Sequence, residues 1–233
     1  MQGFSLNTEV IRDIFQHAKP FGHNEKPESF NLGFGFLYYG IVRAIRPNHV
    51  LVIGSGFGFS VICLALGLKD NGQGRLTFVD PSFDVLKHGP WKTFGGRGNW
   101  DKPEEVAERF RLFGVDEIIT HYKLTSEEFF AGFKAVSLPK IDIAFVDGNH
   151  SYKNVRYDFS GTLEHTKRNS YIFLHDTNIY IREMVRNAGV KRWLKLLKQE
   201  KECFEVLDFP FSSGVAIIRI LKDDAWKYLA AEH

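Results

Sequence analysis

The sequence predicts an α/β fold in which helices cover both faces of a doubly wound, mostly parallel β-sheet. Short β-branched and apolar runs alternate with longer segments of helical periodicity, which is the pattern of parallel strands joined by crossover helices. The last two apolar runs are joined by the short turn Pro210 to Gly214, and such a pair is typical of an antiparallel hairpin at a sheet edge. A chain of 233 residues, 44% of them hydrophobic, suffices for one domain covering residues 1–233.

The individual elements follow in chain order from periodicity and turn residues. Within an N-terminal helical segment, residues 1–48, apolar positions at helical spacing run from Phe34 to Ile45 and end before Pro47. Strands are then predicted at His49 to Ile53, Arg75 to Val79, Glu117 to Tyr122, Ile141 to Val146, Tyr171 to Leu174, Cys203 to Phe209 and Val215 to Leu221. Helices are predicted between the strands, among them Pro103 to Phe113 and Ile181 to Gln199.

The connection from Pro81 to Phe113 is long for a compact domain. It contains Trp91, Trp100 and the glycine-rich stretch GGRGN before its helix begins. We therefore expect residues 81–113 to form a lid or an insertion beside a ligand site.

Composition and charge disfavour several classes of protein. The formal net charge of +2 is too small to indicate a nucleic-acid or membrane partner, because such binding needs clustered positive charge. The N-terminus lacks the pattern of a secretory signal, and the longest apolar run, Val61 to Leu68, is too short to span a bilayer. We expect a cytoplasmic protein. Cys63 and Cys203 lack metal-ligand spacing, and we expect both to be small core residues.

Glycines cluster where the first predicted strand passes into a helix. In VLVIGSGFGFS, Gly54, Gly56 and Gly58 allow a ligand to approach the backbone and the amides of the helix N-terminus. Asp80 ends the next strand, where a carboxylate can accept the hydroxyls of an adenosine ribose. NAD and FAD proteins share this arrangement. The glycines are also compatible with a turn that binds nothing, and Asp80 with a turn or helix-capping role.

Polar side chains also follow the fourth and fifth predicted strands. Asp147 and His150 leave the fourth strand on a glycine-containing turn, and Asp176 leaves the fifth. Because ligands bind beyond the carboxyl ends of the strands in doubly wound sheets, we expect these three side chains to face one crevice. The alternative is that Asp147 and His150 only cap the helix that begins near Ser151.

These motifs together resemble class I S-adenosylmethionine-dependent methyltransferases. The DG-x-H-S-Y motif that begins at Asp147, followed by the HD pair that ends at Asp176, is similar to the family that includes sugar and macrolide O-methyltransferases and cephalosporin-hydroxylase-like proteins. The match extends over roughly residues 34 to 221. It implies a Rossmann-like sheet of the seven-stranded methyltransferase type, which ends in an antiparallel hairpin.

The resemblance implies that S-adenosylmethionine is the cofactor. In that class the glycine loop lies beneath the methionine part, the acid of the second strand holds the ribose, and the adenine rests near the end of the next strand. The residues that match these positions, with Asp147 also beside the cofactor, are Gly54, Ser55, Gly56, Gly58, Asp80 and Ser126, with Thr125 as a neighbour. Val52 departs from the pattern, because the class often has an acid there that helps to hold the methionine ammonium.

The resemblance further implies methylation of a hydroxyl group on a small molecule, such as a sugar or another polyhydroxylated metabolite. Carried over from related O-methyltransferases, Asp147 and Asp176 bind Mg²⁺ or another divalent cation, with Asn178 or Thr177 as a further oxygen donor. A bound cation lowers the pKa of a hydroxyl and fixes its direction of attack. His150 can instead, or also, accept the proton as a general base, so Asp147 and His150 are the predicted catalytic residues.

Several other residues have both a structural and a functional interpretation. We expect His175 to be a packed or hydrogen-bonded histidine rather than a ligand, and Asp158 to be a solvated helix acid rather than a partner of His150. We expect a solvated basic face on the last long helix, formed by Arg182, Arg186, Lys191, Arg192, Lys195 and Lys198. Aromatic residues that either wall an acceptor pocket or pack in the core are Trp91, Trp100, Tyr152 and Tyr180.

Other functions stay open at this point. An RNA methyltransferase would use the basic helix as its platform, and a catalytically inactive S-adenosylmethionine-fold binding module would fit the missing acid at Val52. A dinucleotide oxidoreductase is disfavoured, because the third, helix-packing glycine is absent and the terminal hairpin does not fit. A homodimer is compatible with the sequence.

Overall fold

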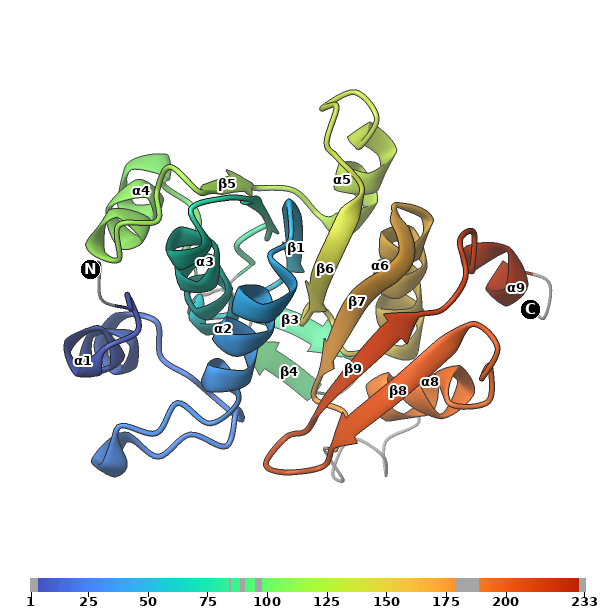
Figure 1. Ribbon diagram of the computed structural model, residues 1–233, viewed down its shortest axis with the longest axis horizontal. Coiled ribbons are helices and arrows are strands. Elements are labelled where there is room, and N and C mark those ends of the chain that lie inside the picture. Colours follow the sequence, from blue (N-terminus) through green and yellow to red (C-terminus); the bar gives the residue numbers. More distant parts are fainter. Residues whose placement is uncertain (1–3, 84, 89–90, 95–97, 179–188, 231–233) are drawn as a thin grey trace.

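The computed structural model describes residues 4–83, 85–88, 91–94, 98–178 and 189–230. Within them a central twisted sheet has helices on both faces (Figure 1). From one edge to the other its strands are β5 (Ile119–Tyr122), β2 (Arg75–Val79), β1 (His49–Ile53), β6 (Ile141–Val146), β7 (Thr166–His175), β9 (Val215–Ile220) and β8 (Phe204–Phe209). All neighbouring pairs are parallel except those that include β9. The predicted doubly wound fold with a terminal antiparallel hairpin is confirmed.

The helices divide into two layers because the sheet buries both of its faces. Helices α1 (Thr8–His17), α2 (Phe34–Ile45), α3 (Phe59–Asn71) and α4 (Pro103–Leu112) contribute to one core, and α5 (Ser126–Gly132), α6 (Tyr152–Glu164), α8 (Val190–Leu197) and α9 (Trp226–Ala230) pack against the other. Along β1, Val50 and Val52 enter the first core, whereas Leu51 and Ile53 enter the second. This alternation explains why the strand reads as an uninterrupted apolar run.

The strand order reverses between β1 and β6, the two neighbours at the centre of the sheet. From β1 the chain winds outward through β2 to β5, then returns to the other side of β1 and continues from β6 to β7. In doubly wound sheets such a switch point opens a crevice at the carboxyl ends of the strands. The glycine loop leaves β1 at this edge, and the turn that begins at Asp147 leaves β6 beside it.

The structure adds detail that the sequence pattern does not predict. Residues 81–113 include a separate two-stranded antiparallel sheet of β3 (Val85–His88) and β4 (Trp91–Phe94). Strand β7 begins at Thr166, whereas the sequence predicted a start at Tyr171. The prediction missed the first half of the strand because that half is polar and lacks an apolar pattern. A short helix, η1 (Pro27–Ser29), precedes α2. The first part of the helix predicted at 181–199 lies outside the described residues, as does Tyr180.

Two further expectations concern the cysteines and the membrane. Cys63 and Cys203 are free and buried, as expected of small core residues. No helix among the described residues combines the length and the apolar character that crossing a membrane requires.

The packing of α6 gives a stability prediction. Phe159 is fully buried between the rings of Trp193 and Phe204, whereas Tyr157 on the same helix is 40% exposed. Replacing Phe159 by alanine should lower the free energy of unfolding by about 3–5 kcal/mol, because the lost contacts leave a cavity. The control Tyr157→Ala should cost less than about 1 kcal/mol. Urea unfolding followed by circular dichroism measures both, and similar costs would show that α6 is not packed as described.

Candidate active site

The turns that follow β1 and β6 touch at the centre of the carboxyl edge. Gly54 has a φ of +72°, and a Cβ atom on it would lie 2.5 Å from the carbonyl oxygen of Asp147. The amide of Asp147 donates to the carbonyl of Ile53, which extends the ladder between the two strands. Only glycine fits here, because the conformation is left-handed and the neighbouring backbone is in the way. The glycine loop is therefore fixed directly against the turn that holds Asp147.

Asp80 ties the end of β2 to the same loop. Its carboxylate accepts hydrogen bonds from the amides of Ser55, at 3.2 Å, and Ser82, at 2.7 Å. Burial raises the pKa of Asp80, and these two amides offset the effect only in part. The turn role that the sequence left open is thus present. Asp80 holds the predicted cofactor loop in place whether or not it also contacts a ribose.

Residues 98–100 pack against the glycine loop. The Asn99 side chain donates to the carbonyl of Gly56 at 3.4 Å. The Trp100 ring is buried, and a Cβ on Gly58 would lie 2.8 Å from it. The ring also contacts Phe78 and Phe110 in the core. Of its two alternatives, Trp100 therefore takes the packing role.

The predicted reaction residues do come together, in a cluster of two carboxylates and two imidazoles. His150 Nε2 lies 3.3 Å from Asp147 Oδ1, and its Nδ1 lies 3.2 Å from Asp176 Oδ2. His175 Nδ1 lies 3.0 Å from Asp147 Oδ1 and 3.4 Å from Asp176 Oδ1. The side chains of Asp147 and His150 are each 15% exposed, so the cluster is partly open to solvent.

The cluster strongly favours an ionised Asp147. Burial alone would raise its pKa, but His175 and His150 outweigh burial and hold the pKa well below its usual range. Burial would likewise lower the pKa of His175, yet the carboxylates of Asp147 and Asp176 raise it to about 9. Near neutral pH the pair is therefore a carboxylate and an imidazolium. His175 is a hydrogen-bonded histidine at the end of a strand, as the sequence indicated.

The helix-capping alternative does not describe this turn. Ser151 is the N-cap of α6, and its hydroxyl accepts the amide of Asn154. Asp147 and His150 contact the cluster instead. Contacts with charged groups, and not helix capping, therefore explain the positions of Asp147 and His150.

The donor set fits a divalent cation. Ligand atoms of Asp147, His150 and Asp176 all lie within 4.8 Å of one another, and oxygen with imidazole donors suits several divalent metals. Asn178, the further predicted ligand, donates its amide to the carbonyl of Pro210 at 2.8 Å. The Thr177 hydroxyl is buried and has no hydrogen-bond partner among the described residues.

A loop near the N-terminus also contacts the cluster, and no sequence pattern predicts this contact. The His23 ring is buried, stacks on His175 with 4.2 Å between centroids, and lies 2.9 Å from the Tyr38 hydroxyl through Nδ1. The carbonyl of Gly22 accepts hydrogen bonds from Ser213 Oγ, at 2.6 Å, and His175 Nε2, at 3.4 Å. The stretch FGHNE has no periodicity, so only its lone histidine could have drawn attention.

Asp158 corrects one expectation outright. It is 3% exposed, not solvated, because it shares the inward face of α6 with Val155 and Thr162. Burial raises the pKa of Asp158 to about 6, although a hydrogen bond with the Ser126 side chain acts to lower it. Its Oδ1 has no hydrogen-bond partner among the described residues. Ser126, the predicted adenine contact, therefore lies beside a buried acid.

The remaining candidates take structural positions. Tyr152 packs on Trp193, and the guanidinium of Arg192 lies over its ring at 4.4 Å. The side chain of Trp91 lies outside the described residues. Val52 is fully buried in the centre of β1.

The fold has counterparts in known proteins. A family model described as a methyltransferase domain matches residues 51–177. In the O-methyltransferase TomG from Streptomyces achromogenes, solved with S-adenosylmethionine, the fold matches with a TM-score of 0.63 over 95% of this chain and 91% of that one, at 14% identity. An O-methyltransferase from Bacillus cereus, in complex with SAH, matches with a TM-score of 0.63 over 94% and 92%, also at 14% identity.

A curated relative is more similar in sequence but much longer. The uncharacterized protein y4gI of Sinorhizobium fredii is 23% identical over 196 residues, which are 84% of this chain. The chain spans only 20% of the length of that protein.

The fold and the site define a class I methyltransferase-type protein. Because the family model covers more than half of its length, the chain belongs to the methyltransferase domain family. The resemblance deduced from the sequence motifs is confirmed.

The buried acid of α6 predicts a pH effect on stability. In the folded protein the pKa of Asp158 is about 6, against an ordinary 3.8. The native state therefore holds this proton more tightly, and the stability contributed by the neutral acid is lost as the pH rises from about 4 to 7. The unfolding free energy of the wild type should fall relative to Asp158→Asn by about 3 kcal/mol over that interval.

Urea titrations of both proteins at several pH values measure this difference. The exposed helix acid Glu108, changed to glutamine, serves as the control and should show no such trend. A difference between wild type and Asp158→Asn that stays constant with pH would contradict the burial of a neutral carboxyl group.

Proposed function

We propose that this protein transfers the methyl group of S-adenosylmethionine to a hydroxyl oxygen of a small molecule. The observation that carries the proposal is the contact between the glycine loop, Gly54 to Gly58, and the turn that begins at Asp147. The glycine loop, held by Asp80, lies directly against the turn from which Asp147 and His150 meet Asp176. We call Asp147, His150, His175 and Asp176 the acid–histidine cluster. A methyl donor on the loop and a hydroxyl at this cluster would thus be neighbours.

The methyl donor is assigned to the loop side of this edge. Gly54, Ser55, Gly56 and Gly58 would contact its methionine part, because the loop backbone leaves room for close approach. Asp80 would accept the ribose hydroxyls, and Ser126 would contact the adenine, with Asp147 between donor and acceptor. Matching folds solved with S-adenosylmethionine or SAH support this assignment.

The acceptor is assigned to the acid–histidine cluster. Asp147 and Asp176, with Asn178 as a further donor, would hold a divalent cation such as Mg²⁺, which lowers the pKa of a hydroxyl when bound. His150 would take the hydroxyl proton. The new oxygen–carbon bond forms as the carbon–sulfur bond breaks, and the sulfonium leaves as a neutral thioether. Alignment of oxygen, carbon and sulfur supplies much of the rate in such a displacement.

Binding of the donor tests the first half of the proposal. The wild type should bind S-adenosylmethionine in calorimetry, and Asp80→Asn should weaken binding by about 10- to 100-fold, because a charge-assisted hydrogen bond contributes roughly 1.5–3 kcal/mol. Asp116→Asn, far along the chain from the loop, should bind as the wild type does. A wild type that does not bind the donor would indicate a binding module that kept only the fold.

Removal of divalent metal tests the second half. With an acceptor that is turned over, SAH formation should be lost in EDTA and restored by excess Mg²⁺. Asp147→Asn and Asp176→Asn should each reduce turnover by at least about 100-fold, and Asp176→Asn should leave donor affinity within a few-fold. Full activity in EDTA would remove the cation from the proposal and leave His150 as the general base.

A further inference from the structure

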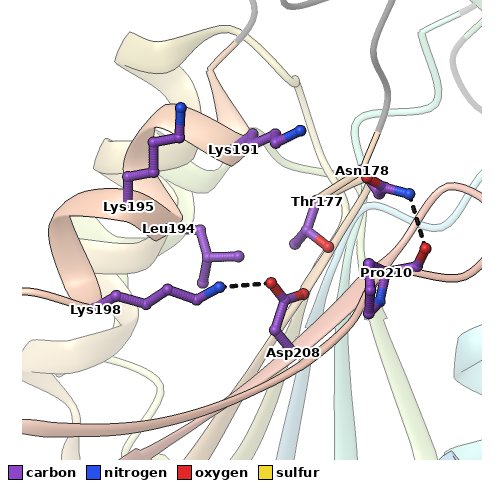
Figure 2. A pocket seen from close by; sticks show the side chains of 8 residues that line it. All are labelled: Thr177, Asn178, Lys191, Leu194, Lys195, Lys198, Asp208 and Pro210. Carbon is purple, nitrogen blue, oxygen red and sulfur yellow. Dashed lines mark hydrogen bonds and ion pairs between the residues drawn. The ribbon is translucent and has the colours of Figure 1, made fainter.

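A pocket lies between α8, strand β8 and the residues that follow β7 (Figure 2). Its volume is about 250 Å³, enough for a small charged group and its first contacts. Leu194 and Pro210 form part of its apolar wall. None of the roles proposed above for donor binding or proton transfer uses it.

Both walls of this pocket begin at the proposed reaction centre. On the strand side, Thr177 and Asn178 line the pocket and directly follow Asp176. On the helix side, the amide of Gly189 donates to the carbonyl of His150 at 3.1 Å, and α8 starts at the next residue. Both sides of the pocket are therefore attached to residues of the cluster, which supports a single small molecule that contacts both.

Among the described residues, lysines outnumber acids in the lining of the pocket. Lys191, Lys195 and Lys198 recur at helical spacing along one side of α8 and all line it. Asp208 is the acidic residue among the described lining residues, and its Oδ2 lies 2.6 Å from Lys198 Nζ. Within the described part of the chain, Lys195 makes no ion pair. Lys195 and Lys198 are exposed, as expected of a solvated basic face, and with Lys191 they also line this pocket.

A neutral donor adds to these charges. Thr177 lines the pocket, and its hydroxyl is buried and has no hydrogen-bond partner among the described residues. It packs against the backbone of Gly214, where a Cβ atom would lie 2.5 Å from Oγ1. A buried hydroxyl without a partner costs free energy unless a ligand or water satisfies it. An anion oxygen would accept this hydrogen bond.

We propose that this pocket binds an anionic group of the acceptor, a carboxylate or a phosphate, through Lys191, Lys195 and Thr177. The acceptor is then a hydroxylated anion, with its hydroxyl at the acid–histidine cluster and its charge in the pocket. This inference rests on the proposed function, whose acceptor class it narrows. A single anionic group fits a pocket of this volume, whereas an RNA strand would need an extended basic surface.

The test uses matched pairs of hydroxylated probes with the full chain. Glucose 6-phosphate is compared with glucose, and 3,4-dihydroxybenzoate with catechol, so that the two pairs distinguish phosphate from carboxylate. Binding is measured by calorimetry and ligand-observed NMR in the presence of Mg²⁺ and SAH. One anionic member should bind at least about 10-fold more tightly than its neutral partner.

Variants assign this preference to the pocket. Lys191→Gln combined with Lys195→Gln should remove it while leaving the affinity for the neutral partner unchanged. Lys201→Gln makes a charge change beyond the end of α8, outside the lining, and should retain the preference. Thr177→Val should weaken only the anionic probe. Circular dichroism verifies that each variant is folded.

The outcomes separate this inference from the proposed function. Equal binding of charged and neutral partners in both pairs, or a preference that survives the double substitution, overturns the inference even if methyl transfer is found. Anion binding that depends on the lysines supports it even if no methyl transfer occurs. Tighter binding of an RNA oligonucleotide, reduced equally by Lys201→Gln, would also overturn it.

Discussion

The pairing of the Asp147 carboxylate with two histidines is the interaction on which the site depends. Desolvation of a carboxylate costs several kcal/mol unless partners of opposite charge and hydrogen-bond donors compensate. His175 supplies the charge and His150 a further contact, both to Oδ1. The backbone of Asp147 meanwhile fixes Gly54 on the neighbouring strand exit. One residue therefore connects the acid–histidine cluster with the glycine loop.

The same pairing connects segments that are distant in the sequence. The imidazolium of His175 also reaches the carbonyl of Gly22 and the hydroxyl of Ser213, so that the N-terminal loop and the terminal hairpin meet at the end of β7. His23 covers the other face of the ring. A change that removed the charge of His175 would therefore loosen three segments at once, and not only one ion pair.

The charges around the site are arranged in opposite senses. The carboxylates of Asp147 and Asp176 lie where β6 and β7 end, and three lysines line the pocket between α8 and β8. A molecule with a hydroxyl at one end and an anionic group at the other could contact both groups at once, with its charge at the lysines. Such polarity would select among acceptors without any change in the methyl-transfer chemistry.

Local periodicity and glycine turns are enough to predict the strands β1, β2 and β6 from the amino-acid sequence. The order of the strands also assigns Asp147, His150 and Asp176 to one edge of the sheet. That assignment needs only the rule that parallel strands end together. The tertiary structure alone decided that Asp158 is buried and that His23 joins the cluster. Burial on a helix face and contact from a loop depend on which element packs there, and no local pattern encodes that partner.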